Sequence, residues 1–205
     1  MRRRSLRAKP LRSKRAFDLV LATLLAPAIV PVLGMCAMAV RIDSPGPIMF
    51  AQERTGKDGK RFRMLKFRTM VQNAEELKAG LQHLNVLEPP DFKIPNDPRI
   101  TRVGKFLRAT SLDELPQFWN VVRGDMSFVG PRPTSFAAST YDLWQTRRLE
   151  AKPGITGPWQ VGGRHTTTLD ERVRLDEDYI QHRSVWRDAK LVAATVPALL
   201  RKEGA

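Results

Sequence analysis

Two adjacent carboxylates, Asp113 and Glu114, stand in a segment of the sequence that is rich in arginine. Arg108 precedes them by a few residues, and Asp125 and Arg132 follow them. A carboxylate that faces arginines has what a nucleophile needs in phosphoryl transfer, because the cations position the phosphate and neutralise its charge. These residue types in this order therefore indicate phosphoryl-transfer chemistry.

Helix capping is a simpler interpretation of the same two acids. The stretch from Ser111 to Glu114 has the spacing of a capping box, which would begin a helix that Gly124 ends. Acidic residues are common in the first turn of a helix because the helix dipole and the exposed amide groups stabilise negative charge. From these residues alone, capping is the more common explanation and chemistry is the alternative.

Other groups suited to phosphate or nucleotide binding lie on both sides of the acidic pair. Arg132 stands between two prolines, which fix the backbone around a guanidinium that can bind a phosphate through two hydrogen bonds. Lys66 belongs to a densely basic stretch, residues 60–68. The segment 152–164 contains four glycines, Trp159, Gln160 and Arg164. We expect this segment to be a loop that seats a nucleotide against the indole ring and the backbone amides.

The composition limits the class of protein. The chain has 205 residues, of which 42% are hydrophobic, so we expect about one folded domain rather than a disordered chain. The 35 Lys and Arg residues outnumber the 21 acidic ones, and eight of these bases lie in residues 1–15. This surplus predicts an anionic partner: a nucleic acid, a lipid headgroup or a phosphorylated substrate. A single cysteine and three histidines exclude a disulfide-stapled secreted scaffold and a zinc finger.

A stretch of 22 residues without charge, Leu19 to Val40, follows the basic start of the chain. As a helix it would be about 33 Å long, enough to cross a bilayer. Proline in its middle argues against both a cleaved signal peptide and a straight spanning helix. The alternative is a re-entrant hairpin that breaks at Pro27 and leaves Arg15 and Arg41 on the same membrane face. The residues alone leave the spanning helix and the hairpin open, and they suggest that Asp18 pairs with Arg15.

The remaining elements predict an α+β fold. Residues 48–54 and 60–68 read as two strands of a β-hairpin, and Asn73 caps a helix to about residue 84. Arg102, Lys105 and Arg108 share one stripe of an amphipathic helix, which suits the membrane interface as well as a protein core. Two more helices are expected over about 170–183 and 188–202. The part of the chain after the apolar stretch is therefore expected to be small and globular, with helices, a short β-hairpin and interfacial amphipathic helices.

Three strings carry a resemblance to a known family: KFRTM (66–70), SLDELPQFWNVVRGDMSFVGPRP (111–133) and PGITGPWQVGGR (153–164). With the basic and then apolar start, they resemble the bacterial sugar transferase family, the monotopic phosphoglycosyl transferases, over residues 14–201. The resemblance implies a basic tail (1–15), a re-entrant membrane helix (16–41) and a catalytic domain (42–205) on the cytoplasmic face of the inner membrane. The family's usual Ser-Pro break is Ala26-Pro27 here, and Gly162 stands where Asn or Ser is usual.

The same resemblance implies a two-step reaction. A nucleotide (UDP) sugar transfers its sugar 1-phosphate to Asp113, and undecaprenyl phosphate then accepts it, which initiates exopolysaccharide or related glycan assembly. Glu114 is the second member of the dyad, and we favour an electrostatic or metal-positioning role for it. Further implied contacts are to phosphate or nucleotide (Arg108, Lys66, Arg132, Gln160 and Arg164) and to Mg²⁺ (Asp113 and Asp125).

Expected partners are the UDP-sugar, undecaprenyl phosphate and membrane lipids. No nucleic acid is expected, and homo-oligomer formation stays open. The alternatives are a membrane-anchored basic protein without enzymatic activity and a nucleic-acid-binding protein. The first has no use for the acidic dyad, and the second explains neither the dyad nor the uncharged segment.

Overall fold

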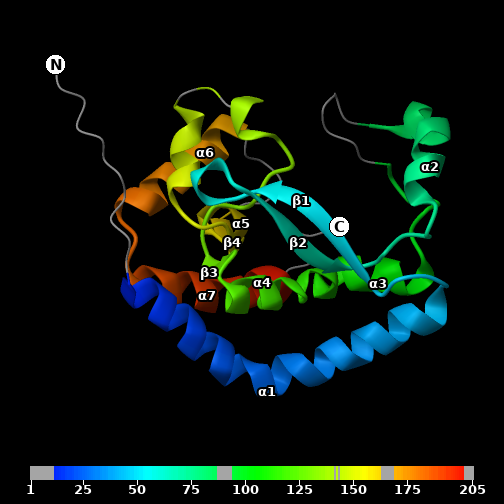
Figure 1. The fold of residues 1–205 in the computed structure, drawn as a ribbon, viewed down its shortest axis with the longest axis horizontal. Coiled ribbons are helices and arrows are strands. Elements are labelled where there is room, and N and C mark those ends of the chain that lie inside the picture. Colours follow the sequence, from blue (N-terminus) through cyan, green and yellow to red (C-terminus); the bar gives the residue numbers. More distant parts are fainter. Residues whose placement is uncertain (1–11, 87–93, 141, 143, 163–168, 201–205) are drawn as a thin grey trace.

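The computed structural model describes residues 12–86, 94–140, 142, 144–162 and 169–200. Helix α1 (Arg12–Asp43) lies along one side of the molecule, beneath a row formed by α3 (Arg102–Ala109), α4 (Gln117–Arg123) and α7 (Val185–Leu200) (Figure 1). Two small sheets and the other helices lie above this row. The mixture of helices and small sheets confirms the expected α+β class.

Helix α1 is continuous but bent in its middle, and both of its ends rise toward the rest of the molecule (Figure 1). Pro27 and Pro31 lie inside it, and each removes the amide that would bond the carbonyl four residues earlier. Both prolines are exposed, and the Thr23 hydroxyl bonds the Leu19 carbonyl at 3.0 Å, a contact that also favours bending. The structure thus has a bent helix where the sequence predicted a break at Pro27. The helix is long and apolar enough to cross a membrane.

Polar contacts tie the start of α1 to the rest of the protein. Asp18 is buried and accepts hydrogen bonds from the Ser127 hydroxyl (2.9 Å) and the next backbone amide (3.1 Å). Arg15 donates to the carbonyls of Val121 and Val122, at the end of α4. The predicted Asp18–Arg15 pair is therefore wrong, because both side chains bind groups that are far away in sequence. Residues 1–11 of the expected basic tail lie outside the described residues, and residues 12–15 are already helical.

The predicted β-hairpin is confirmed. Strands β1 (Met49–Thr55) and β2 (Arg61–Phe67) pair antiparallel, and a short 3₁₀ turn, η1 (Lys57–Gly59), joins them.

A second, parallel sheet was not predicted. It pairs β3 (Ser127–Val129) with β4 (Gly154–Thr156). Both β4 and the helix that follows it, α5 (Pro158–Gly162), lie inside residues 152–164, which were expected to be a loop. Glycine allows the close approach of these strands, since a Cβ atom on Gly154 would lie 2.1 Å from the Gly130 nitrogen. Strands of three residues leave too short a pattern in the sequence to be recognised.

The remaining helices surround these sheets. They are α2 (Ala74–Lys78), η2 (Ala79–Leu84), η3 (Leu112–Glu114), η4 (Ala138–Thr140), η5 (Gln145–Glu150) and α6 (Leu169–Gln181). Asn73 precedes α2 but makes no side-chain cap, and the predicted helix is α-helical only to Lys78. The two C-terminal helices are confirmed, with α7 beginning at Val185 rather than at residue 188. The main core joins α1, β2, α4, β3 and α6 through Ala22, Met64, Val121, Met126, Val129 and Tyr179.

Candidate active site

Three separate elements bring charged groups together around the acidic dyad. Lys66 is on β2, Asp113 and Glu114 are on η3, and Arg132 follows β3. The Glu114 carboxylate accepts hydrogen bonds from Lys66 Nζ at 2.8 Å and from Arg132 Nη2 at 2.7 Å, with a further bond from Arg132 Nη1 at 3.3 Å. Asp113 lies 3.8 Å from Lys66 Nζ as an ion pair. The structure therefore brings together four of the residues that the sequence selected.

The dyad does not form the predicted capping box. Ser111 has a left-handed backbone (φ 57°) and no side-chain capping bond, the dyad occupies a single 3₁₀ turn, and α4 begins only at Gln117. The reason lies in the partners of Glu114, whose carboxylate is held by two cations instead of turning back to the Ser111 amide. Gly124 does end α4 in a left-handed conformation, as predicted.

The environment shifts the pKa values of the two carboxylates in opposite directions. Burial alone would raise the pKa of Glu114, but the charges of Arg132 and Lys66 outweigh it and hold that pKa well below its ordinary value. Burial raises the pKa of Asp113, and the neighbouring negative charge of Glu114 also raises it, although Lys66 acts in the other direction. Pairs of acids with divergent pKa values often divide the chemical roles at an active site. The charge of Glu114 is compensated by its two cationic partners, whereas the pKa of Asp113 is raised.

Arg108 lies at the end of α3, close enough for its charge to lower the pKa of Asp113. Its Nε atom donates to the Thr69 hydroxyl at 2.9 Å. Thr69 follows β2 and is buried. Sequence reasoning missed Thr69, although it lies inside the string KFRTM.

The other residues selected from the sequence lie elsewhere or cannot be placed. Asp125 contacts Arg123 (3.5 Å) and Asn120 (3.2 Å), and its contact with Mg²⁺ stays a prediction. Among the described residues, no cluster of three or more acidic, His or Cys side chains forms a ready metal site. Gln160 is buried and donates to the Ile155 carbonyl at 2.9 Å, and Arg164 lies outside the described residues.

Trp159 does not form the exposed stacking platform that the sequence suggested. Its side chain is 8% exposed, and the Arg172 guanidinium lies 4.9 Å from the ring centre. The indole is therefore part of the packing of α5 against α6.

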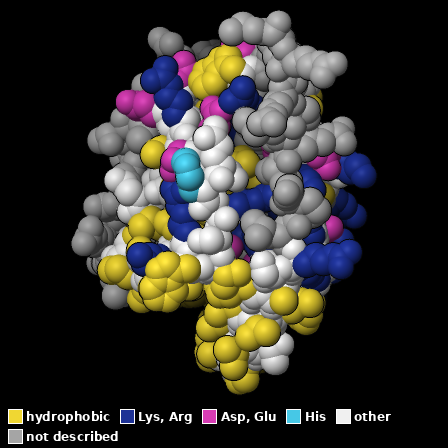
Figure 2. Space-filling model, turned by 90° about the vertical axis from the view of Figure 1, so that its left-hand side faces the viewer, with side chains coloured by type: hydrophobic (Ala, Val, Ile, Leu, Met, Phe, Trp, Pro, Cys, Tyr) yellow, Lys and Arg dark blue, Asp and Glu magenta, His cyan; other side chains and the backbone are white. Residues whose placement is uncertain are grey.

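An apolar groove of about 560 Å³ runs between α1 and α3 and reaches Leu112, the residue before the dyad. Its walls include Val32, Met35, Cys36 and Ala39 from α1 and Val103, Phe106 and Leu107 from α3. Figure 2 shows hydrophobic side chains gathered toward the lower end of the molecule. The apolar stripe of α3 was visible in the sequence, but the groove needs the packing of two elements about sixty residues apart.

The geometry suits a reaction on phosphate esters. Lys66, Arg108 and Arg132 surround the dyad with positive charge, while two of these cations already neutralise Glu114. A phosphate that approaches Asp113 would therefore meet cations before it meets an uncompensated carboxylate.

Comparison with known proteins gives the family. The model of the family described as bacterial sugar transferase matches residues 9–202. A UDP-galactose-lipid carrier transferase of Erwinia amylovora is 43% identical, over 94% of this chain and 41% of that protein. A UDP-glucose:undecaprenyl-phosphate glucose-1-phosphate transferase of Caulobacter vibrioides is also 43% identical, over 94% of this chain and 71% of that protein.

An exopolysaccharide production protein, ExoY, of Sinorhizobium fredii is 38% identical, over 94% of this chain and 87% of that protein. The chain spans about two fifths of the length of several other curated relatives that it matches. The family match covers nearly the whole chain and includes the dyad and all three cations around it. This chain belongs to the bacterial sugar transferase family.

Proposed function

We propose that this protein transfers a sugar 1-phosphate from a UDP-sugar to undecaprenyl phosphate and so initiates exopolysaccharide or related glycan assembly. The observation that carries the proposal is the unequal dyad: Glu114 is neutralised by Lys66 and Arg132, which leaves Asp113 as the carboxylate that can react. The relatives' names support the substrate classes, since they describe transfer from UDP-sugars and to undecaprenyl phosphate. Neither a nucleic-acid-binding protein nor a non-enzymatic anchor needs such a dyad.

The reaction proceeds in two displacements at one phosphorus. In the first, an Asp113 carboxylate oxygen attacks the phosphorus that carries the sugar, the bond from that phosphorus to the bridging oxygen breaks, and uridine monophosphate leaves. In the second, a phosphate oxygen of undecaprenyl phosphate attacks the same phosphorus and the carboxylate of Asp113 leaves. The products are uridine monophosphate and an undecaprenyl diphosphate sugar, and the enzyme returns to its starting state.

The cations around the dyad bind and orient the phosphates in both steps. Arg132 presents a guanidinium that is already held in place by Glu114, and Lys66 lies between the two carboxylates. Glu114 acts through these cations, because a phosphate monoester with a second pKa of about 6 is largely ionised at neutral pH and needs no general base.

Mg²⁺ fits this site as a partner of Asp113. Asp113 has a single ion pair, at 3.8 Å, among the described residues, so its oxygens are more available to a cation than those of Glu114. Mg²⁺ in proteins is commonly held by one or two carboxylates together with the phosphates of the substrate. When bound, Mg²⁺ would supply positive charge that offsets the repulsion of the Asp113 carboxylate and the donor diphosphate.

The membrane arrangement is part of the proposal. The bend at Pro27 and Pro31 supports a re-entrant α1 that enters and leaves on the cytoplasmic face of the inner membrane. Basic residues at both ends of the helix, Arg15 and Arg41, favour the same cytoplasmic side. The apolar groove between α1 and α3 supports a lipid-linked acceptor, because it leads from the apolar helix to the residue before the dyad.

An assay of uridine monophosphate release tests this proposal. The full chain in detergent, with undecaprenyl phosphate and Mg²⁺, is given a panel of UDP-sugars, beside Asp113→Asn and the surface control Glu53→Gln. We expect release with at least one sugar in the wild type and the control, and none with Asp113→Asn. No release by folded wild-type protein with any UDP-sugar would contradict the proposed function.

A further inference from the structure

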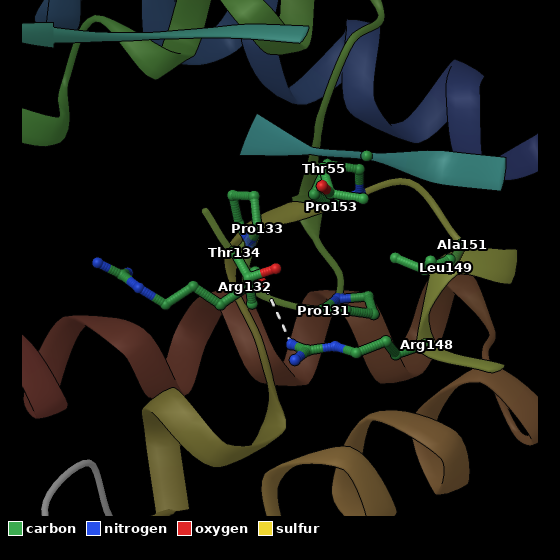
Figure 3. Close-up of a pocket in the computed structure, with 10 residues that line it drawn as sticks. Thr55, Pro131, Arg132, Pro133, Thr134, Arg148, Leu149, Ala151 and Pro153 are labelled. Carbon is green, nitrogen blue, oxygen red and sulfur yellow. Dashed lines mark hydrogen bonds between the residues drawn. The ribbon is translucent and has the colours of Figure 1, made fainter. Parts of the chain in front are cut away.

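The backbone of the loop that carries Arg132 is held from outside the active site. Arg148, on η5, donates from Nη2 to the Arg132 carbonyl at 3.0 Å. Figure 3 shows this bond, with the Arg132 side chain extending away from Arg148. Arg132 is therefore held at both ends, by Arg148 at its backbone and by Glu114 at its guanidinium.

Pro133 makes this backbone hydrogen bond important for the position of Arg132. Pro133 has no N–H, so the peptide unit between Arg132 and Pro133 offers only the Arg132 carbonyl for hydrogen bonding. Among the described residues, Arg148 is the partner of that carbonyl. The preceding peptide is fixed in another way, since the Gly154 amide bonds the Pro131 carbonyl at 2.9 Å.

Arg132 and Arg148 both line a cavity of about 10 Å³ (Figure 3). That volume is at most enough for one water molecule. Arg148 is thus the hydrogen-bonded neighbour of the Arg132 carbonyl at this cavity.

Arg148 is itself fixed by a buried ion pair. Its side chain is 4% exposed, and Nη2 lies 2.8 Å from an oxygen of Asp176, on α6, which is fully buried. Burial raises the pKa of the Asp176 carboxyl to about 7 although Arg148 acts in the other direction, which indicates how strongly this interior disfavours charge. A buried ion pair seldom stabilises a fold more than apolar residues of the same size would. The Arg148–Asp176 pair is therefore weak evidence for a role in stability alone.

We propose that Arg148, anchored by Asp176, is a positioning residue for the transfer reaction. It fixes the Arg132 carbonyl, so that the Arg132 guanidinium is held ready to neutralise Glu114 and to bind phosphate. This inference rests on the proposed function.

The neighbouring residue provides a matched control. Arg147 also lies on η5 and pairs with Glu177 on α6, so it joins the same two elements as the Arg148–Asp176 pair. Its side chain is 55% exposed. Removal of Arg147 therefore perturbs the contact between η5 and α6 without freeing the Arg132 carbonyl.

The test is a double-mutant cycle between Arg148→Met and Arg132→Lys, in which lysine preserves a cation and hence measurable turnover. The full chain is assayed for uridine monophosphate release, with kcat and the KM for the UDP-sugar measured separately, and with Tm as a record of folding. We expect Arg148→Met to lower kcat about 10- to 100-fold with little change in KM, since small misplacements of a catalytic group have effects of this size. In the Arg132→Lys background the same change should lower kcat less than about threefold, because the paired contacts of the Arg132 guanidinium with Glu114 are already lost. Arg147→Met should keep the wild-type kcat.

Three results would overturn the inference in an active enzyme: equal losses in both backgrounds, a kcat for Arg148→Met within about twofold of the wild type, or an equal loss in Arg147→Met. If Arg148→Met does not fold, the isosteric Asp176→Asn takes its place in the cycle, with the same coupling expected at a smaller size. A wild-type protein that releases no uridine monophosphate would instead refute the proposed function, and this inference with it.

Discussion

Replacement of Glu114 by glutamine tests how the two carboxylates divide their roles. Glu114 accepts charge-assisted hydrogen bonds from Lys66 at 2.8 Å and from Arg132 at 2.7 Å. Glutamine keeps one oxygen acceptor but loses the charge. We therefore expect the interaction of residue 114 with Lys66 and Arg132 to weaken by about 2 kcal/mol, within the range measured for hydrogen bonds to charged groups. If the whole loss appears in the transition state, kcat falls about 30-fold.

The same substitution should change the pH profile in a defined direction. Asp113 reacts only when ionised, so activity is lost as the pH falls through its pKa. The negative charge of Glu114 raises that pKa, and its removal should therefore lower it. We expect the acid limb of the kcat/KM profile to move to lower pH in Glu114→Gln.

The assay is uridine monophosphate release across a pH series, with Glu53→Gln as the control because this glutamate is largely exposed on β1. A loss of activity as complete as in Asp113→Asn would show that Glu114 takes part directly in bond making. An acid limb that moves to higher pH would refute the electrostatic reasoning.

Two further predictions concern the fold and the membrane. Gly154→Ala places a Cβ atom 2.1 Å from a backbone nitrogen, so it should lower the free energy of unfolding by about 3 kcal/mol or more. The control Gly80→Ala should not lower it, because nothing lies within 4 Å of the added Cβ atom. Equal Tm values of the two variants in detergent would contradict this reasoning. Single cysteines at Ser13 and Ile42, near the two ends of α1, in a Cys36→Ala background should both react with an impermeant maleimide from the cytoplasmic side of the membrane. Labelling from opposite sides would show a spanning helix.

Local patterns were sufficient for several elements. The turn signal at residues 56–59 predicted β1 and β2 on either side of it within two residues, and the stripe of Arg102, Lys105 and Arg108 predicted α3. In each of these elements the residues that decide the structure lie close together in sequence. The apolar stretch likewise predicted α1, but its bend depends on two prolines within a helix that stays continuous.

The active site shows where local reasoning fails. The capping box was predicted from Ser111 and Glu114 because their spacing fits, but the Glu114 carboxylate has stronger partners on β2 and after β3. No local sequence pattern predicts a hydrogen bond between residues 66 and 114. Residue types and the family resemblance together selected the four residues of the site, whereas their pairing follows from tertiary structure alone.

The contacts of Arg148 that hold the Arg132 backbone could not be predicted from the sequence. Arg148 and Asp176 are separated by 28 positions, and the sequence gives no sign that the first bonds the Arg132 carbonyl. The parallel pairing of β3 with β4 was missed for the same reason, since each strand has three residues and its partner is distant.

In the proposed reaction, Asp113 carries the sugar phosphate between the donor and the acceptor. The most direct test of this role is to incubate the full chain with a UDP-sugar and Mg²⁺ but without acceptor, and to locate the modified residue by peptide mass spectrometry. We expect about one sugar phosphate per chain on Asp113, an equal amount of uridine monophosphate, and loss of the adduct when undecaprenyl phosphate is added. An adduct on Glu114, or an unmodified chain that turns over normally once acceptor is present, would contradict a role for Asp113 as the carrier.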